Sequence, residues 1–318
     1  MSEPVAAPAS EAPGASREVV QEVVRSGSRA LAVRRLAPRA AAGDVPVAPV
    51  VLLHGLGQSS TDWLGVLPEL DGRLEPWEVD LPGHGASPPP ADGNYTTAAH
   101  ARTVVRFVEE HLREPVHLAG NSLGGLVSLM IAARRPDLVR TLTLVSPALP
   151  ARVPSRGGAG LLLLSTPRLG ERLLASGARR PVERRARDLL ELIFARPDAV
   201  AEEDLAALVE ELRRRGELPH AGPALLASLR GLVTVHLLQS RRTWRLAREV
   251  GTPTLVLYGG RDKLVSATAA RRARRMFPTA RIEVDPTGGH IPQREHPRVV
   301  AQALVRHALV HGAVPRTV

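Results

Sequence analysis

Short apolar runs rich in Val and Leu alternate with longer segments in which apolar residues recur at helical spacing. The short runs lie at residues 47–53, 76–81, 115–119 and 142–145, and a strand-like pattern also begins at Arg29. Runs of this length bounded by glycine and proline are typical of buried strands. The periodic segments between them, at 62–70, 95–112 and 122–134, are predicted to be helices. This alternation predicts a parallel sheet with helices on its faces.

The alternation stops at Pro147 and resumes only at Thr254. The residues between show helical patterns at 161–164, 189–194, 205–212 and 225–238. Strand, helix, strand and helix then follow at 254–258, 267–277, 281–284 and 297–311. We therefore predict an α/β core domain of residues 18–147 and 250–318, interrupted by a helical cap at residues 148–249. An insertion this long in a compact domain usually has a function, typically as a lid over a site.

The first 17 residues are rich in Ala, Pro, Ser and Glu and have no periodicity, so we predict a disordered tail at 1–17. They lack a basic start followed by an apolar stretch, and no secretory signal is expected. The longest unbroken apolar run is far shorter than the roughly 20 residues that span a membrane, so no transmembrane segment is expected. These observations favour a cytoplasmic location.

The chain of 318 residues carries a formal net charge of +10, and Lys263 is its only lysine. Arginines are spread along the chain and aromatic residues make up only 3%, which argues against a nucleic-acid partner. A net positive charge of this size is compatible with attraction to an anionic membrane surface or an acidic substrate. There is no cysteine, which excludes disulfides, thiolate metal sites and a cysteine nucleophile.

The clearest chemical motif is Gly120-Asn121-Ser122-Leu123-Gly124, placed where a predicted strand ends and a helix begins. A Gly-x-Ser-x-Gly sequence in that context forms a nucleophile elbow, a sharp turn that presents the serine at the carboxyl end of the sheet. The glycines let neighbouring backbone pass close by. The amides at the start of the following helix can stabilise negative charge at the same place. Ser122 is therefore the predicted nucleophile.

A serine hydroxyl needs a base, and the base needs an acid to orient it. Asp262 follows the strand at 254–258, and His290 follows the next strand, so both belong to the sheet edge that carries Ser122. Asp262 alternatively pairs with its neighbour Arg261. The strand after the nucleophile helix ends in Ser146-Pro147 without a carboxylate, which favours Asp262 as the acid.

Two other aspartates near these motifs receive different interpretations. Asp285 is too close to His290 along the chain to be its partner from a separate loop. Asp80 precedes the glycine-rich loop at 82–85 and is predicted to order it.

The oxyanion hole requires two backbone amides. Leu123 directly follows the nucleophile, and Leu56 lies in the glycine-rich turn after the strand at 47–53, so these two amides are the predicted donors. The side chain of His54 is predicted to hold this turn by hydrogen bonding.

With these residues the chain resembles the α/β-hydrolase superfamily, in its branch with a helical cap between the sixth and seventh strands. The matching pieces are HGLGQSS (54–60), DLPGHGAS (80–87), GNSLGG (120–125), GGRD (259–262) and GGHIPQREHP (288–297). The resemblance implies an α/β-hydrolase fold: a mostly parallel eight-stranded sheet with helices on both faces and a cap after the sixth strand.

The resemblance also implies a serine hydrolase that works through an acyl-enzyme, with no metal and no organic cofactor. Ser122, His290 and Asp262 would form the triad, and the amides of Leu56 and Leu123 would bind the oxyanion. Ser122 stands where epoxide hydrolases and haloalkane dehalogenases carry an aspartate, so those activities are not expected. Hydrolysis of a carboxylic ester is the first hypothesis. Carbon–carbon bond hydrolysis, acyl transfer, cofactor-free haloperoxidase activity and a non-catalytic binding role are the alternatives.

The predicted cap is rich in leucine and poor in aromatic residues. Most of these leucines are expected to pack the cap on itself and on the sheet, but some must line the space over Ser122. Such a pocket suits an acyl or aliphatic chain better than a flat aromatic ring. The expected partner is a small-molecule ester with an apolar acyl part, bound by a monomer or homodimer.

Overall fold

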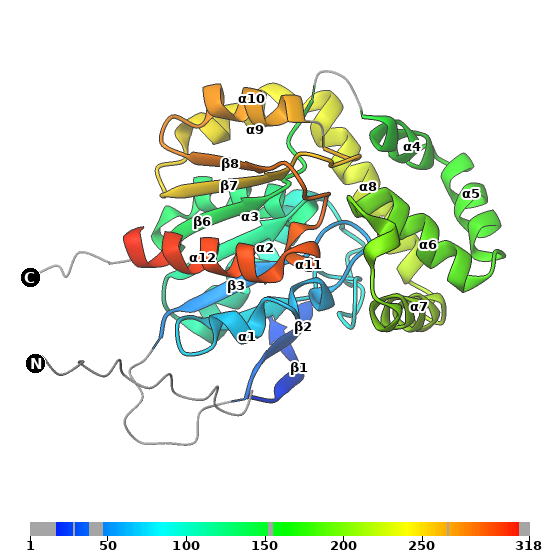
Figure 1. The fold of residues 1–318 in the computed structure, drawn as a ribbon, viewed down its shortest axis with the longest axis horizontal. Coiled ribbons are helices and arrows are strands. Elements are labelled where there is room, and N and C mark those ends of the chain that lie inside the picture. Colours follow the sequence, from blue (N-terminus) through cyan, green and yellow to red (C-terminus); the bar gives the residue numbers. More distant parts are fainter. Residues whose placement is uncertain (1–16, 28, 38–46, 152–154, 266, 312–318) are drawn as a thin grey trace, which may run out of the picture.

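The computed structural model describes residues 17–27, 29–37, 47–151, 155–265 and 267–311. Its centre is an eight-stranded sheet in the order β1-β2-β4-β3-β5-β6-β7-β8 (Figure 1). The strands are β1 (Val19–Ser26), β2 (Arg29–Leu36), β3 (Pro49–Leu53), β4 (Glu75–Val79), β5 (Val116–Asn121), β6 (Val139–Val145), β7 (Thr254–Gly259) and β8 (Arg281–Asp285). Strands β1, β2 and β4 pair antiparallel, and all other neighbours are parallel. The predicted fold class is confirmed.

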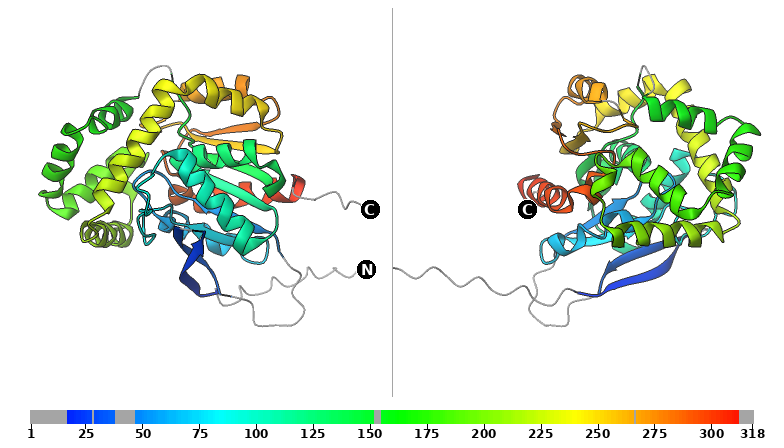
Figure 2. Two further views of the ribbon diagram at one scale, coloured as in Figure 1. Left: turned by 180° about the vertical axis from the view of Figure 1, so that it is seen from behind. Right: turned by 45° about the vertical axis from the view of Figure 1, so that its right-hand side comes forward.

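Helices cover both faces of the sheet (Figures 1 and 2). Helices α2 (Thr97–Phe107), α3 (Leu123–Arg134), α9 (Ser240–Glu249) and α10 (Ala267–Met276) contribute to one apolar core, while α1 (Leu67–Leu70) and α12 (Pro297–His311) form a second. Neighbouring strand residues enter opposite cores, as Val51 and Leu52 of β3 do. Strands β3 and β5 are buried throughout, which explains their continuous apolar sequence.

Two elements near the amino end of the core differ from the sequence prediction. The segment 62–70 is not one helix: a 3-10 helix (Ser60–Trp63) is followed by the single turn α1. Pro68 has no N–H to donate to the carbonyl of Leu64, so a continuous helix is interrupted there. Strand β1 was not predicted because, as an edge strand, it leaves Val19 and Val23 exposed and has no clean alternation.

The remaining core elements are short or extend their neighbours. A π-helical turn (Val108–Leu112) continues α2 to the end of the predicted helix. A 3-10 turn (Pro136–Leu138) precedes β6, and α11 (Pro292–Glu295) precedes α12.

The segment between β6 and β7 forms a layer of helices beyond the carboxyl edge of the sheet (Figure 1). It contains α4 (Arg156–Leu164), α5 (Leu169–Ala178), α6 (Val182–Ile193), a 3-10 turn (Pro197–Ala199), α7 (Glu202–Gly216) and α8 (Ala221–Leu238). Helices α6 and α7 pack on each other around Leu190 and Leu208. Helix α9, within the predicted cap range, instead packs against α3 and α10, and its Trp244 belongs to the main core.

Among the described residues, α8 is long and apolar enough to cross a membrane by length and composition, with a mean hydropathy of 1.4 over its 18 residues. Arg230 interrupts its apolar run, so no single stretch in the sequence points to it. In the fold, 39% of the helix is buried, and it contacts α2, α4, α5 and α9. A core helix of a folded domain has the same composition, so this is weak support for a membrane span.

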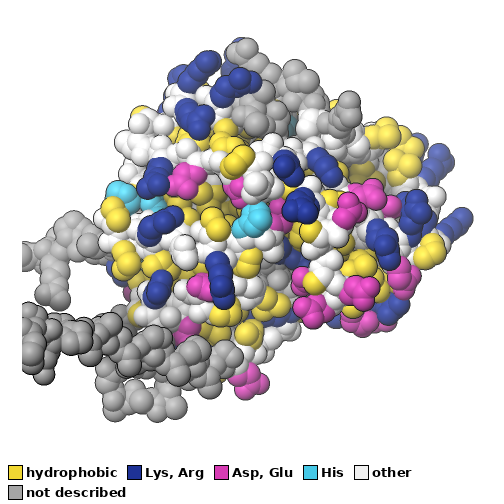
Figure 3. Space-filling model, in the orientation of Figure 1, with side chains coloured by type: hydrophobic (Ala, Val, Ile, Leu, Met, Phe, Trp, Pro, Cys, Tyr) yellow, Lys and Arg dark blue, Asp and Glu magenta, His cyan; other side chains and the backbone are white. Residues whose placement is uncertain are grey.

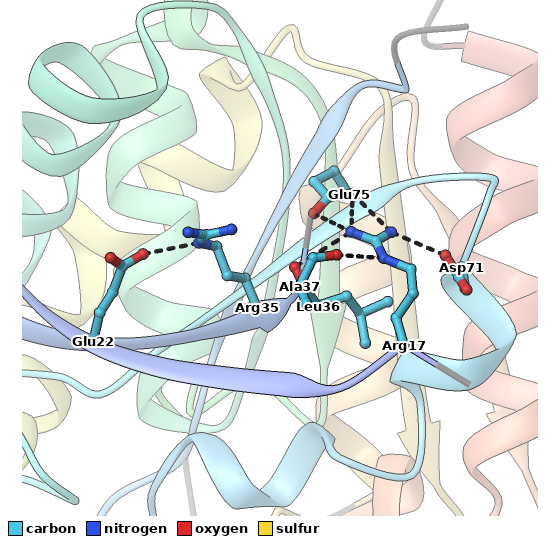
Figure 4. A network of polar contacts seen from close by, with 7 residues as sticks. All are labelled: Arg17, Glu22, Arg35, Leu36, Ala37, Asp71 and Glu75. Carbon is cyan, nitrogen blue, oxygen red and sulfur yellow. Dashed lines mark hydrogen bonds and ion pairs between the residues drawn. The ribbon is translucent and has the colours of Figure 1, made fainter. Parts of the chain in front are cut away.

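The predicted tail lies outside the described residues except for Arg17, which is fixed against the core (Figure 4). Its Nε donates to the carbonyl oxygen of Ala37 at 2.6 Å, and its terminal nitrogens lie 3.0 Å from Asp71 and 3.2 Å from Glu75. Arg17, the first described residue, therefore contacts the core although the sequence assigned it to the tail.

Candidate active site

Ser122 lies at the turn between β5 and α3 with φ 51° and ψ −111°. A positive φ is unfavourable for a residue with a side chain, by about 1–3 kcal/mol, and persists where the surroundings enforce it. Here the flanking glycines let β3 pack directly against the turn: a Cβ atom on Gly124 would lie 2.5 Å from the carbonyl oxygen of Leu53. This close packing holds Ser122 in its conformation. The Ser122 amide donates to the carbonyl oxygen of Val145 at 3.0 Å. The turn has the strand–serine–helix geometry that the motif predicts.

Asp262 and His290, from the loops after β7 and β8, are hydrogen-bonded. Oδ2 of Asp262 lies 2.8 Å from Nδ1 of His290. Oδ1 of Asp262 accepts the amides of Leu264 and Val265 at 2.7 and 2.8 Å. Burial raises the pKa of the Asp262 carboxyl, but the nearby His290 and these hydrogen bonds outweigh it and lower the pKa overall. Asp262 is thus an acceptor and Nδ1 of His290 carries a proton, the arrangement that the predicted role of Nε2 as the base requires.

The elbow and the histidine loop are joined by Asn121. Its side-chain amide donates to the backbone carbonyl oxygens of His290 at 3.0 Å and of Val145 at 3.1 Å. Ser122 and His290 are both buried and line one cavity. The structure therefore brings the three predicted triad residues to one place, and their catalytic roles stay a prediction.

The two predicted oxyanion donors lie beside the elbow. Leu123 is the first residue of α3, so its N–H has no partner within the helix. Leu56 belongs to residues 54–61, which we call the oxyanion loop, and it lines the cavity. A Cβ atom on Gly55 would lie 2.9 Å from the side-chain oxygen of Asn121, which shows how closely this loop approaches the elbow. Their role as oxyanion donors stays a prediction.

His54 holds the oxyanion loop, as predicted. Its Nε2 accepts the amide of Leu81 at 2.9 Å, so the ring proton is on Nδ1, which donates to the carbonyl oxygen of Gly55 at 2.7 Å. Complete burial lowers the pKa of His54 and keeps the ring neutral. The Gly55 carbonyl and the Leu56 N–H belong to one planar trans peptide, so His54 also orients that N–H away from itself.

The other two aspartates behave as the sequence predicted. Oδ1 of Asp80 accepts the amide of Ser60 at 2.6 Å and Oδ2 accepts the amide of Ala86 at 2.8 Å, so Asp80 orders the loop around it. Oδ1 of Asp285 accepts the amide and the hydroxyl of Thr287 at 2.8 and 2.6 Å. Neither carboxylate is the partner of His290.

A cavity of about 370 Å³ lies over Ser122 between the sheet edge and the cap. It is lined mainly by leucines, among them Leu161, Leu162, Leu164, Leu189, Leu192, Leu225, Leu229, Leu232 and Leu237. Its described lining contains no Phe, Tyr or Trp. Other cap leucines that the sequence offered, such as Leu190 and Leu226, pack in the interior and do not line it. The cavity is thus the apolar, aromatic-poor pocket that the sequence predicted.

Sequence reasoning missed two cavity residues of the cap with titratable side chains, Arg215 and His236. Nδ1 of His236 lies 3.0 Å from the carbonyl oxygen of Leu232, one turn earlier on α8. Burial lowers the pKa of His236. The helical spacing from Leu229 through Leu232 to His236 places them on one face, but only the packing of α8 directs that face to the cavity. Within the described part of the chain, no group of three or more His, Asp or Glu side chains is arranged to hold a metal ion.

Comparison with known proteins gives consistent results. The family described as alpha/beta hydrolase fold matches residues 48–297. A pimeloyl-[acyl-carrier protein] methyl ester esterase from Methylococcus capsulatus is 33% identical over 217 residues, which cover 68% of this chain and 77% of that protein. The dihydrolipoyllysine-residue acetyltransferase component of the acetoin cleaving system from Cupriavidus necator is 30% identical over 258 residues, covering 81% of this chain. The chain spans only 63% of that relative.

Among solved structures, the meta-cleavage product hydrolase from Pseudomonas fluorescens superimposes with a TM-score of 0.71 at 17% identity. The match covers 91% of this chain and 98% of that one. At this identity the likeness concerns the fold alone.

Proposed function

Because this chain belongs to the α/β-hydrolase fold family, we propose that it is a serine esterase for a carboxylic ester with an apolar acyl group. One observation carries the proposal. Ser122, in its strained turn, opens into the same leucine-lined cavity as His290, whose Nδ1 is held by Asp262 at 2.8 Å. This proximity supports a role for His290 in activating the Ser122 hydroxyl next to an apolar binding space.

In the acylation step, Nε2 of His290 takes the hydroxyl proton as Oγ of Ser122 attacks the ester carbonyl carbon. The carbonyl electrons move to oxygen, and the N–H groups of Leu56 and Leu123 stabilise the oxyanion. The tetrahedral intermediate then collapses and the bond to the alcohol oxygen breaks. His290 returns its proton to that oxygen, which leaves an acyl-Ser122 ester and a free alcohol.

Deacylation repeats these steps with water as the nucleophile. Nε2 of His290 takes a proton from water, hydroxide adds to the acyl carbon, and the same two amides hold the oxyanion. Collapse releases the carboxylic acid and returns the proton to Ser122. The ionised Asp262 stabilises the protonated ring of His290 in both half-reactions.

We propose that the acyl group lies along α8. The lining residues Leu225, Leu229, Leu232 and His236 form one helical stripe, and the lining residue Leu237 follows at its end. Leu225 is next to Gly57 of the oxyanion loop, whereas Leu237 is 66% exposed at the surface. At 1.5 Å per residue the stripe is about 18 Å long. It supports an extended acyl chain running from Ser122 towards the surface.

Two leucines that line this cavity, Leu162 and Leu237, are exposed at the surface. Together with four other exposed leucines of the cap they form what we call the leucine rim: Leu162, Leu163, Leu169, Leu173, Leu237 and Leu238. Figure 3 shows hydrophobic side chains gathered over α4 with basic side chains beside them. Residues 156–180 and 230–249 each contain five arginines and one glutamate. Exposed apolar side chains among cations suit an anionic lipid surface, which is the partner that our proposal includes.

The test is hydrolysis of nitrophenyl esters from acetyl to palmitoyl by the wild type and Ser122→Ala. We expect turnover by the wild type, a maximum at one acyl length, and loss to background in the variant. A fluorophosphonate should label the wild type and spare Ser122→Ala. A wild type that binds esters but is not labelled would contradict the proposal and favour a non-catalytic binding protein.

The same assay separates hydrolysis from the alternative reactions of a serine triad. Addition of a primary alcohol or hydrogen peroxide would divert the acyl group from water in an acyltransferase or a haloperoxidase. We expect the carboxylic acid to remain the main product. A labelled serine with no ester turnover would instead direct the search to thioesters, lactones and carbon–carbon substrates.

A further inference from the structure

Helix α7 of the cap reaches the oxyanion loop through two charged residues one helical turn apart. The carboxylate of Glu211 accepts hydrogen bonds from the hydroxyls of Ser59 at 2.6 Å and Thr61 at 2.7 Å. An N–H of the Arg215 guanidinium donates to the carbonyl oxygen of Gly57. These contacts extend from Gly57 to Thr61, so α7 holds the second half of the loop.

The two charges also lie next to each other. Nη2 of Arg215 is 3.5 Å from Oε1 of Glu211, and their side chains are only 23% and 14% exposed. Burial raises the pKa of Glu211, but Arg215 and the two hydroxyls outweigh it, so the pKa is lowered and the carboxylate stays ionised. A buried ion pair contributes little to stability compared with apolar packing of the same volume. What these two charges do instead is fix the position of the oxyanion loop through their hydrogen bonds.

This position matters for the peptide with the Leu56 N–H. On one side, His54 holds the carbonyl oxygen of Gly55 and thereby fixes the plane of this peptide. On the other side, Gly57 has φ 68°, in the left-handed region that glycine enters as readily as the right-handed one. Its backbone is therefore free to turn, and Arg215 fixes it by donating a hydrogen bond to its carbonyl oxygen. The oxyanion donor is thus held by the core at one end and by the cap at the other.

We propose that Glu211 and Arg215 are positioning residues that hold the oxyanion loop in its catalytic conformation, so that the oxyanion hole is complete only when α7 is seated on the loop. This proposal rests on the proposed esterase function. It links the cap to transition-state stabilisation in addition to substrate selection. Loss of either side chain then affects the chemical step more than substrate binding.

The experiment compares Glu211→Gln and Arg215→Met with two controls on the exposed side of the same helix, Glu210→Gln and Arg213→Met. Loss of one oxyanion donor lowers kcat by about 10²–10³-fold, so a displaced donor is expected to cost about tenfold to a hundredfold. KM should change by less than about threefold. Binding of an alkyl boronic acid, which mimics the tetrahedral intermediate, should weaken by the same factor as kcat. Arg215→Lys, which keeps a cationic donor, should restore part of kcat.

The controls change the same residue types at positions that are 74% and 52% exposed, so kcat should stay within about twofold of the wild type. Equal kcat values in all four variants would overturn the proposal. So would parallel losses of kcat and boronic acid affinity in the controls. A wild type without esterase activity or fluorophosphonate labelling would instead refute the proposed function, which separates the two failures.

A second pair of variants tests the contact from the loop side if the charge variants fold poorly. Thr61→Val removes the hydroxyl that donates to Glu211, whereas Thr61→Ser keeps it. Thr61→Val should lower kcat and boronic acid affinity together, and Thr61→Ser should resemble the wild type in both. Unchanged kcat in a folded Thr61→Val protein would contradict the proposal.

Discussion

Oδ2 of Asp262 accepts a hydrogen bond from Nδ1 of His290 at 2.8 Å, while the amides of Leu264 and Val265 hold Oδ1. Both carboxylate oxygens of Asp262 are thus held by hydrogen bonds from neighbouring groups. Because a carboxylate has no proton to donate, the ring of His290 is held with its proton on Nδ1. The predicted basicity of Nε2 depends on this contact.

Asp262→Asn should therefore lower kcat strongly while the protein still folds. An amide can donate to Nδ1 and favour the tautomer with the proton on Nε2, which no longer acts as a base. A loss of about 10⁴-fold in kcat is expected, as in other serine triads. Asp285→Asn, five residues before His290, is the control, because Asp285 bonds to Thr287. Equal losses in both variants, measured on a nitrophenyl ester, would contradict the assignment of Asp262.

Leu229 lies in the middle of the cavity stripe on α8 and is 1% exposed. Leu229→Phe should obstruct long acyl chains while leaving room for short ones near Ser122. In an apolar pocket, a mismatch of one or a few methylenes changes kcat/KM by at least about tenfold. The kcat/KM for the palmitoyl ester should therefore fall at least about tenfold relative to that for the acetyl ester. Leu309→Phe on α12 enlarges a leucine that is 71% exposed and does not line the cavity. The same profile in both variants would place the acyl chain elsewhere.

The leucine rim should bind anionic lipid. We expect the wild type to sediment with vesicles of phosphatidylcholine containing phosphatidylglycerol, and less with pure phosphatidylcholine, because the rim lies among arginines. The double variant Leu237→Gln, Leu238→Gln should sediment several-fold less with the vesicles, because two exposed apolar side chains no longer enter the lipid surface.

The matched control for the rim is Leu309→Gln on α12, which changes a leucine that is 71% exposed and outside the cap. It should sediment like the wild type. If the rim variant sediments equally well, the rim is not the contact surface. If it instead shifts from dimer to monomer in light scattering, the rim contacts a second copy of the chain and not a lipid surface.

Asp62 should make stability depend on pH. Burial raises its pKa to about 7, although Arg294 lies 3.7 Å away and opposes this. The unfolded carboxyl ionises near pH 4 and the folded one only near pH 7, so this group destabilises the fold progressively as pH rises between these values. Above pH 7 the destabilisation is complete and constant. Asp62→Asn, which is neutral throughout, avoids it.

We therefore expect the unfolding free energy of Asp62→Asn, relative to the wild type, to rise by about 3 kcal/mol between pH 5 and pH 8. Urea unfolding at several pH values measures it. Asp198→Asn, on an exposed 3-10 turn, is the control and should leave the curves nearly unchanged. A difference between Asp62→Asn and wild type that does not vary with pH would show that Asp62 is ionised at pH 5 in the folded protein.

The sequence predicted most of the sheet because its signals are local. The run at 115–119 and the helix at 122–134 correspond to β5 and α3, and the final helix at 297–311 has the predicted bounds. The elements that were missed lack a clear local pattern. Strand β1 pairs with its sequence neighbour β2 but is an exposed edge strand without clean alternation, and the packing of α9 on α3 and α10 is not visible in its periodicity.

The amino-acid sequence by itself determined the chemical groups and their order: a serine in a glycine turn, an aspartate and a histidine after successive strands, and a leucine-rich insertion. These are set by residue type, spacing and short-range sterics. Only the tertiary structure decided which leucines line the cavity and that Glu211 meets Ser59 and Thr61. Those partners are separated by about 150 residues. Contacts at that separation follow from how the cap folds back over the sheet, which no local pattern encodes.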